Sequence, residues 1–159
     1  MPAVDRTPSK AAVIVTRTFA APRELVFRAC TEAPLMSQWF ARGPKMPEGK
    51  ILELDARPGG RYLIEVVSDM DGRTYRMQGT YREVIRPSRL SFTWWYDLAD
   101  FDESLVTIDL REVDDGKTEL TLTHSLLPDR MRDAHRQGWE ECLEALDQAL
   151  GASSRLLGS

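Results

Sequence analysis

Residues 128–150, PDRMRDAHRQGWEECLEALDQAL, decide the fold of this chain. Apolar and small side chains recur every three or four residues there, the period of an α-helix with one buried face. The side chains on that face are Met131, His135, Gly138, Trp139, Cys142, Ala145, Leu146 and Ala149. Asp129 is suited to cap the start of a helix, and Gly151 is typical of a helix end. The stretch therefore predicts one long amphipathic helix over residues 129–150.

The preceding residues alternate apolar and polar side chains, which is the period of a β-strand. Glycine-containing turn signals separate the strands, among them Pro58-Gly59-Gly60, Asp71-Gly72 and Asp115-Gly116. The predicted strands cover residues 50–56, 61–67, 73–85, 89–97, 104–113 and 117–127. Because short turns join consecutive strands, we expect an antiparallel meander.

The N-terminal part predicts a strand and two short helices. Residues 12–19, AVIVTRTF, are rich in β-branched side chains. A helix is expected to open at Ala21-Pro22, and a shorter one to run from Pro34 to near Phe40. Polar and small residues at the two ends predict flexible tails over 1–10 and 151–159. Residues 11–150 are then a single domain.

The number of strands relative to helices determines how these elements pack. One helix is about 10 Å wide, whereas strands lie about 4.8 Å apart, so a single helix cannot cover a flat sheet of this size. The apolar face of the sheet must nevertheless be covered. The sequence therefore predicts an α+β domain: a curved antiparallel sheet of about six strands around a long C-terminal helix, with two short helices after the first strand. A groove between sheet and helix is expected.

Composition excludes several classes of protein. The chain is 42% apolar and 29% charged, with a net charge of −4 and no basic run, so nucleic acid is not an expected partner. No apolar run approaches the roughly 20 residues of a membrane span, and the N-terminus lacks the apolar core of a signal peptide. Cys30 and Cys142 lie within apolar patterns, which indicates reduced, buried thiols and a cytoplasmic protein.

The inward-facing positions of the strands and the helix supply the candidate ligand-binding residues. Their apolar bodies with a few polar tips are typical of a small-molecule site, although the same side chains also fill cores. The candidates are Trp39, Tyr62, Ile64, Tyr75, Met77, Tyr81, Phe92, Trp94, Tyr96, Ile108, Leu122, His124, His135, Trp139 and Cys142. Gly138 costs helix stability, so we expect a large side chain from the sheet to need its space.

Five separated motifs, in a fixed order, carry a family resemblance. They are VTRTFAAPRELVFRACTEAPLMSQWF, DARPGGRY, GTYREVIRPSRLSFTW, TELTLTH and HRQGWEECLEAL. Together they resemble the bacterial AHSA-like family over about residues 12–150. Its members are similar to the C-terminal domain of the activator of the ninety-kilodalton heat-shock protein ATPase. The resemblance implies the START-like (SRPBCC, Bet v allergen-like) helix-grip fold, the order β-α-α-β6-α and a deep hydrophobic cavity.

The resemblance implies binding of a hydrophobic small molecule of lipid, polyketide or aromatic type, with a role in stress response or regulation. An alternative is a cyclase- or hydrolase-like enzyme in which His124 or His135 acts as general base beside a tyrosine. No catalytic motif is present, and no third ligand joins the histidines for a metal. Neither a catalytic residue nor a cofactor is therefore predicted, and a binding role is favoured over an enzyme.

A further alternative is a protein-interaction domain or homodimer. Trp95 and Leu105 are apolar residues at outward positions of their strands, where a partner would cover them. Asp55, Arg57 and Arg61 around the Pro-Gly-Gly turn form either a polar cavity mouth or a surface ion pair that fixes the turn.

Overall fold

The computed structural model describes residues 12–40, 48–67, 72–96 and 103–157. Its elements, in chain order, are β1 (Val13–Phe19), α1 (Arg23–Thr31), α2 (Ala33–Met36), β2 (Glu48–Leu54), β3 (Arg61–Val67), β4 (Thr74–Ile85), β5 (Arg89–Tyr96), β6 (Ser104–Asp114), β7 (Lys117–Ser125) and α3 (Asp129–Leu157). This order confirms the implied β-α-α-β6-α arrangement. The predicted tail over residues 1–10, and Asp71 of the predicted Asp71-Gly72 turn, lie outside the described residues.

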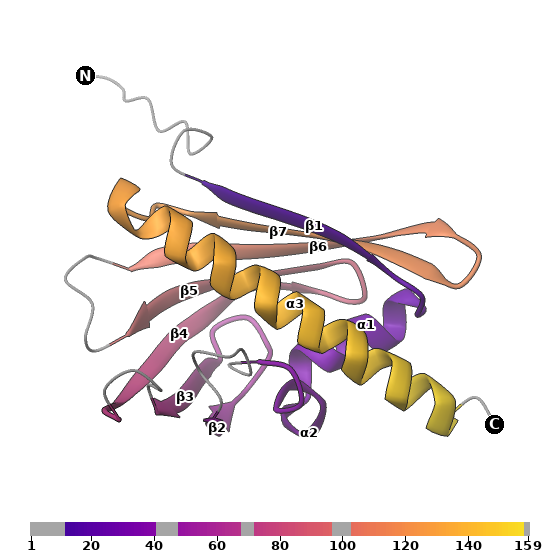
Figure 1. Ribbon diagram of the computed structural model, residues 1–159, viewed down its shortest axis with the longest axis horizontal. Helices are drawn as coiled ribbons and strands as arrows, with labels where there is room; N and C mark the ends of the chain where they lie inside the picture. The colour runs from indigo at the N-terminus through magenta and orange to yellow at the C-terminus, as the bar shows by residue number, and fades with distance from the viewer. Residues whose placement is uncertain (1–11, 41–47, 68–71, 97–102, 158–159) are drawn as a thin grey trace.

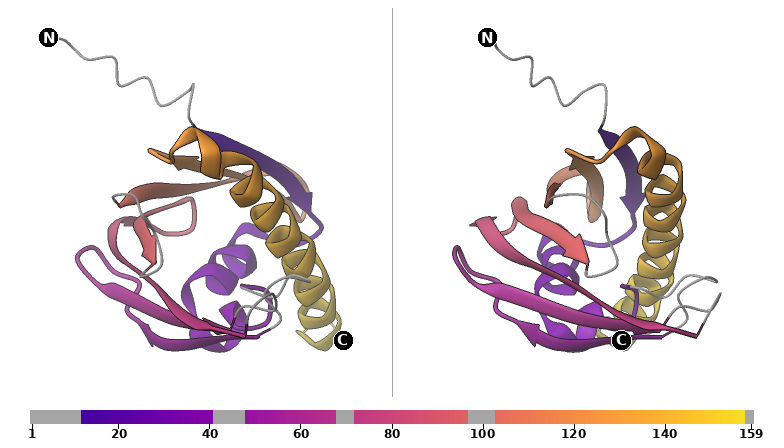
Figure 2. Two further views of the ribbon diagram at one scale, coloured as in Figure 1. Left: turned by 60° about the vertical axis from the view of Figure 1, so that its left-hand side comes forward. Right: turned by 90° about the vertical axis from the view of Figure 1, so that its left-hand side faces the viewer.

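The strands form one antiparallel sheet in the order β1-β7-β6-β5-β4-β3-β2. Consecutive strands are neighbours from β2 to β7, as the short turns predicted, and β1 joins the far side of β7. Figures 1 and 2 show the sheet curving around α3, with α1 and α2 closing one end. The helix-grip fold is thereby confirmed.

Alternate side chains are buried on β3, β6 and β7, as the period of two predicted, whereas on β5 Ser91 and Thr93 are buried as well. On β3 the buried residues are Tyr62, Ile64 and Val66, each at most 2% exposed. The same parity holds on the other long strands, where the inward residues are Met77, Tyr81, Leu90, Phe92, Trp94, Val106, Ile108, Leu110, Leu120, Leu122 and His124. The predicted inner face is therefore confirmed for these positions.

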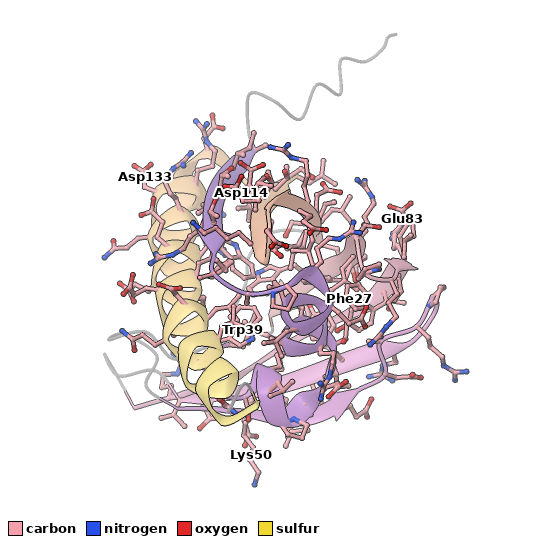
Figure 3. All side chains as sticks on the ribbon, turned by 90° about the vertical axis from the view of Figure 1, so that its right-hand side faces the viewer. Phe27, Trp39, Lys50, Glu83, Asp114 and Asp133 are labelled. Carbon is pink, nitrogen blue, oxygen red and sulfur yellow. The ribbon has the colours of Figure 1, made fainter. Side chains whose placement is uncertain are left out.

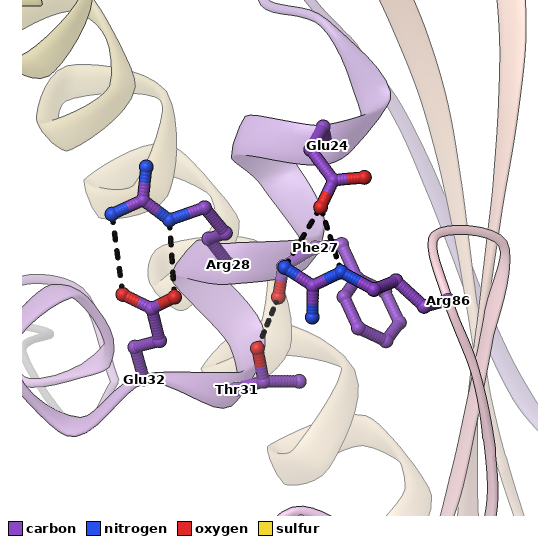
Figure 4. Close-up of polar contacts among 6 residues, drawn as sticks. All are labelled: Glu24, Phe27, Arg28, Thr31, Glu32 and Arg86. Atoms are coloured by element: carbon purple, nitrogen blue, oxygen red, sulfur yellow. Dashed lines mark hydrogen bonds and ion pairs between the residues drawn. The ribbon is translucent and has the colours of Figure 1, made fainter.

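Helix α1 is fixed to the turn between β4 and β5 through Arg86 (Figure 4). Its guanidinium lies 2.7 Å from Glu24 Oε1, and its Cζ lies 5.1 Å from the centre of the Phe27 ring. On the next turn of α1, Arg28 and Glu32 form an ion pair at 3.0 Å. These exposed pairs contribute little energy. Phe27 beneath them is 1% exposed, and its burial in the core anchors α1.

Helix α3 is longer than predicted. It continues through Gly151 to Leu157, so the prediction of a helix end at Gly151 is wrong. A glycine ends a helix when it adopts a positive φ. Positive φ angles occur at Gly59, Gly72 and Gly116 but not at Gly151, which keeps the helical conformation.

One flank of α3 is attached to strand β1. Arg17 of β1 pairs with Glu144 at 2.9 Å and with Asp147 at 3.1 Å. Arg136 donates to the backbone oxygen of Ile14 at 3.0 Å, which satisfies a carbonyl on the outer edge of β1. The helix therefore covers this edge of the sheet.

The opposite flank of α3 carries small or flexible residues. At 3.6 residues per turn, Met131, Gly138 and Ala145 recur every seven residues on the flank away from β1. All three are half-buried. We call them the open flank of α3. Beyond it lie β3, β4 and β5 (Figures 1 and 2).

The expectation that Gly138 makes room for a large side chain is wrong. No atom of the described residues lies within 4 Å of a Cβ built on Gly138, outside the local helix backbone. Since neither sterics nor a positive φ requires glycine there, Gly138→Ala should raise the free energy of unfolding by about 1 kcal/mol. Urea denaturation followed by circular dichroism measures this. A destabilised Gly138→Ala variant would contradict the open space.

Candidate functional site

Aromatic and imidazole rings gather where α3 crosses β5 and β7. Trp94 lies with its ring centre 5.0 Å from Trp139, 5.4 Å from His124, 5.8 Å from Phe40 and 6.5 Å from His135. The two imidazoles meet edge to face at 5.2 Å. We call these five residues the indole–imidazole cluster. Four of them are predicted ligand-binding residues, which tertiary packing brings together from β5, β7 and α3.

Both ring nitrogens of His124 are hydrogen-bonded. Trp139 Nε1 donates to His124 Nδ1 at 3.0 Å, so Nδ1 carries no proton. The neutral ring then has its proton on Nε2, which donates to Ser104 Oγ at 2.7 Å. Ser104 in turn donates to the backbone oxygen of Trp94 at 3.2 Å. With the ring fully buried, His124 offers no nitrogen to a substrate, and the hypothesis that it is a general base is wrong.

Burial keeps His124 neutral. It lowers the pKa of His124 well below its ordinary value, and repulsion from His135 acts in the same direction. His135 is half-buried and donates from Nδ1 to the backbone oxygen of Met131 at 2.9 Å. Burial also lowers the pKa of His135, against an opposing contribution from that hydrogen bond. The imidazoles of the cluster are therefore uncharged at neutral pH.

The other end of the interior, next to α1 and α2, is packed. Its side chains enclose a void of about 10 Å³, which is the size of one water molecule. The walls are Cys30, Met36, Trp39, Phe40, Tyr62, Tyr81, Phe92, Ile108 and Trp139. Figure 3 shows Trp39 in this interior, between α1 and α3. A ligand of ordinary size does not fit within these walls.

Hydrogen bonds fix the polar tips at the packed end. Trp39 Nε1 donates to the Ala29 oxygen at 2.8 Å, and Tyr62 Oη donates to the Thr93 oxygen at 2.7 Å. Burial raises the pKa of Tyr62 and of Tyr81 well above that of free tyrosine, so both are protonated. Burial likewise raises the pKa of Cys30 to about 12, which leaves an inert thiol.

The remaining candidates divide into two groups. Ile64, Met77, Leu122 and Cys142 are each at most 5% exposed and lie in the hydrophobic core. The side chains of Tyr75 and Tyr96 lie outside the described part of the structure. Cys30 and Cys142 are both buried and form no disulfide with each other, as predicted.

Trp94 differs from the other two buried tryptophans. Its Nε1 is buried and has no hydrogen-bond acceptor among the described residues, whereas Trp39 and Trp139 each have one. The sequence pattern places all three indoles inside. It contains no signal for which of them lacks a partner, because the partners are 10 and 15 residues away along the chain.

The polar residues around the Pro-Gly-Gly turn form an ion pair, as one of the two interpretations predicted. Arg57 Nε lies 2.8 Å from Asp55 Oδ2. Gly60 N donates to the Arg57 oxygen at 2.7 Å, which closes the turn. A shallow hollow of about 420 Å³ lies beside them, with Arg61 among its walls. A role as a cavity mouth stays a prediction.

The outward residues Trp95 and Leu105 are half-buried. Trp95 borders an open hollow of about 390 Å³ whose other walls are Arg61, Gln78, Gly79, Thr80 and Glu103. This hollow is mostly polar, unlike the apolar patches typical of obligate interfaces. Within the described ranges, no helix is long and apolar enough to cross a membrane.

Comparison with known proteins gives a family match and many similar structures. The model of the family described as activator of Hsp90 ATPase homolog 1-like protein matches residues 20–151. A Chromobacterium violaceum protein is 26% identical over 87% of this chain and 96% of its own, with a TM-score of 0.79. A Rhodobacter sphaeroides protein is 30% identical over 89% and 93%, with a TM-score of 0.71. The Silicibacter pomeroyi AHSA1 protein is 25% identical over 89% and 99%, with a TM-score of 0.75. A search of curated proteins gave no significant match.

Proposed function

The chain belongs to the family of activator of Hsp90 ATPase homolog 1-like proteins, and on that premise we propose that it is a binding module for an apolar small molecule. The molecule lies along the open flank of α3 and against the indole–imidazole cluster. The proposal places it at this end because the other end is packed down to a water-sized void.

The observation that carries the proposal is the open flank of α3. The flank facing β1 is held by ion pairs and a hydrogen bond, whereas a Cβ on Gly138 would meet no atom of the described residues within 4 Å. His135 lies one helical turn from Gly138 and touches the ring of Trp94. An apolar ligand on this flank would therefore reach the cluster.

The chemistry of the cluster favours binding over catalysis. His124 is held by two hydrogen bonds within the core, and the cysteine thiol of Cys30 is kept protonated. Aromatic faces supply large contact areas for an apolar ligand. We therefore infer a carrier or sensor of apolar compounds rather than an enzyme.

A fluorescent dye tests the proposal. Nile red is uncharged and apolar, and its emission rises and shifts to the blue in apolar surroundings. We expect saturable binding to the wild-type protein. Gly138→Trp, which fills the open flank, should weaken binding at least about tenfold, a loss of about 1.4 kcal/mol.

The matched control is Gln148→Trp, which adds the same side chain to an exposed position on the outer side of α3. Dye affinity should then stay within about twofold of wild type, less than about 0.5 kcal/mol. Circular dichroism and urea denaturation confirm that both variants fold. Absence of saturable binding to wild type, or equal affinity in Gly138→Trp, would contradict the proposed location.

The cysteines support a location for this function. Both thiols are buried, and Cys30 is protonated. Thiols of this kind persist in reducing compartments. We infer that the protein acts in the cytoplasm.

A further inference from the structure

The most unusual polar group in the interior is the indole N–H of Trp94. The side chain is 5% exposed, and Nε1 has no hydrogen-bond acceptor in the described part of the chain. Most buried N–H groups are paired, because an unpaired one has lost its bond to water without replacement. This donor is therefore available to an acceptor from outside the chain.

None of the described groups around Trp94 accepts a hydrogen bond from its Nε1. Its backbone oxygen already accepts from Ser104, and the ring lies among Phe40, Trp139 and the two histidines. Both nitrogens of His124 have partners, and Nδ1 of His135 is used by Met131. Contacts with these rings fix the indole in place.

Because the indole–imidazole cluster carries no charge, it limits which kind of acceptor group can bind there. Burial lowers the pKa of both histidines, so the rings around Trp94 are neutral. An ionised carboxylate leaving water needs a cation or several donors to replace its hydration. The uncharged oxygen of a ketone, an ester or an amide loses far less hydration free energy when it leaves water, and a single hydrogen-bond donor can replace that hydration.

We infer that the bound molecule carries an uncharged hydrogen-bond acceptor, a carbonyl oxygen by preference, and that Trp94 Nε1 donates to it. This inference rests on the proposed function, since it names the class of ligand for the same site. A site with this donor should prefer aromatic or alicyclic ketones, esters and amides. Pure hydrocarbons and ionised fatty acids are disfavoured.

Three probes of one skeleton test the inference by isothermal titration calorimetry. Benzophenone has a carbonyl between two phenyl rings, diphenylmethane has a methylene there, and diphenylacetate carries a carboxylate. By apolar character alone, diphenylmethane should bind best. We expect the reverse, with benzophenone about tenfold tighter than diphenylmethane, since one hydrogen bond to a buried donor has this effect. Diphenylacetate should bind weakest.

Trp94→Phe keeps an aromatic ring and removes only the N–H. In this variant the preference for benzophenone should disappear, and diphenylmethane should bind at least equally well. The control is Trp95→Phe, the neighbouring tryptophan on the outer face of β5, in which the preference should persist. Thermal unfolding checks that both variants fold.

A second readout observes the donor directly. The chain has four tryptophans, so an ¹⁵N-labelled sample gives four indole N–H signals, and triple-resonance spectra of the wild-type protein assign the one of Trp94. Benzophenone should shift this signal downfield, and diphenylmethane should not. This readout on the wild-type protein decides the question even if Trp94→Phe fails to fold.

The outcomes separate the two proposals. If the hydrocarbon and the ketone bind equally, or the Trp94 signal does not respond to the ketone, the donor is used by a water and the inference is wrong while the binding function stands. If neither probe nor Nile red binds the wild-type protein, the proposed function itself is wrong, and the inference falls with it.

Discussion

Gly79→Ala should strongly destabilise the fold. A Cβ at this position would overlap the backbone oxygen of Thr93 and lie 2.7 Å from Cε2 of Tyr62. Backbone cannot move aside as a flexible side chain does, so we expect a loss of at least about 3 kcal/mol. That is a large fraction of the roughly 5–15 kcal/mol that stabilises a domain.

The close approach occurs where β4 and β5 keep one register. Gln78 pairs with Trp95 and Tyr81 with Phe92, and the register shifts only beyond them, between Tyr81 and Glu83. Side chains add bonds to this stretch: Tyr62 Oη donates to the Thr93 oxygen at 2.7 Å, and Thr80 N donates to Thr93 Oγ1 at 2.8 Å. The strands are held too close for any Cβ at Gly79.

Urea denaturation at constant pH measures the effect, with soluble yield as a second readout. Gly138→Ala is the matched control, because the same substitution there meets no atom of the described residues and should stabilise. A Gly79→Ala protein within about 1 kcal/mol of wild type would mean that β4 and β5 separate locally at low cost.

Lowering the pH from 7 to 5 should lower the free energy of unfolding through His124, by at most about 2 kcal/mol. Burial lowers the pKa of folded His124 well below its ordinary value, while an unfolded histidine titrates near pH 6.5. Below about pH 6.5 the unfolded chain binds a proton that the folded chain does not, so the free energy of unfolding falls as pH falls. The slope approaches about 1.4 kcal/mol per pH unit, and His135 adds a smaller part in the same direction.

Urea denaturation at intervals between pH 7.5 and 5 checks this dependence. His124→Gln should be less stable at pH 7.5 by about 1–3 kcal/mol, because an amide cannot satisfy both Ser104 and Trp139 in the same geometry. Its acid dependence should nevertheless be shallower than that of wild type, because the titrating ring is gone. Equal slopes in the two proteins would show that His124 is not the group responsible.

The sequence predicts the fold because the patterns that specify it are local. Alternation on β3 placed Tyr62, Ile64 and Val66 inside, and each is buried. The same local rule was wrong at Gly151, where a residue that often ends helices continues α3. It was also wrong at Gly138, because periodicity gives the direction of a position on a helix but not what stands opposite it.

The candidate site was predictable only as a set of residues. Parity on β5 and β7 and periodicity on α3 place Trp94, His124 and Trp139 on inner faces, which is a property of each element alone. Whether those residues enclose a space depends on how far apart the elements lie. The two ends differ in the described residues: side chains pack closely around Trp39, whereas a Cβ on Gly138 would meet none of their atoms within 4 Å.

By itself, the sequence determined the order of the elements and the inward face of each, because both follow from contacts between residues two to four positions apart. Tertiary structure alone decided the pairing of polar groups. His124 meets Trp139 across 15 residues and Tyr62 meets Thr93 across 31, at distances set by the curvature of the sheet. The same geometry leaves the Trp94 donor without an acceptor among the described residues, while both nitrogens of the neighbouring His124 are bonded to Ser104 and Trp139.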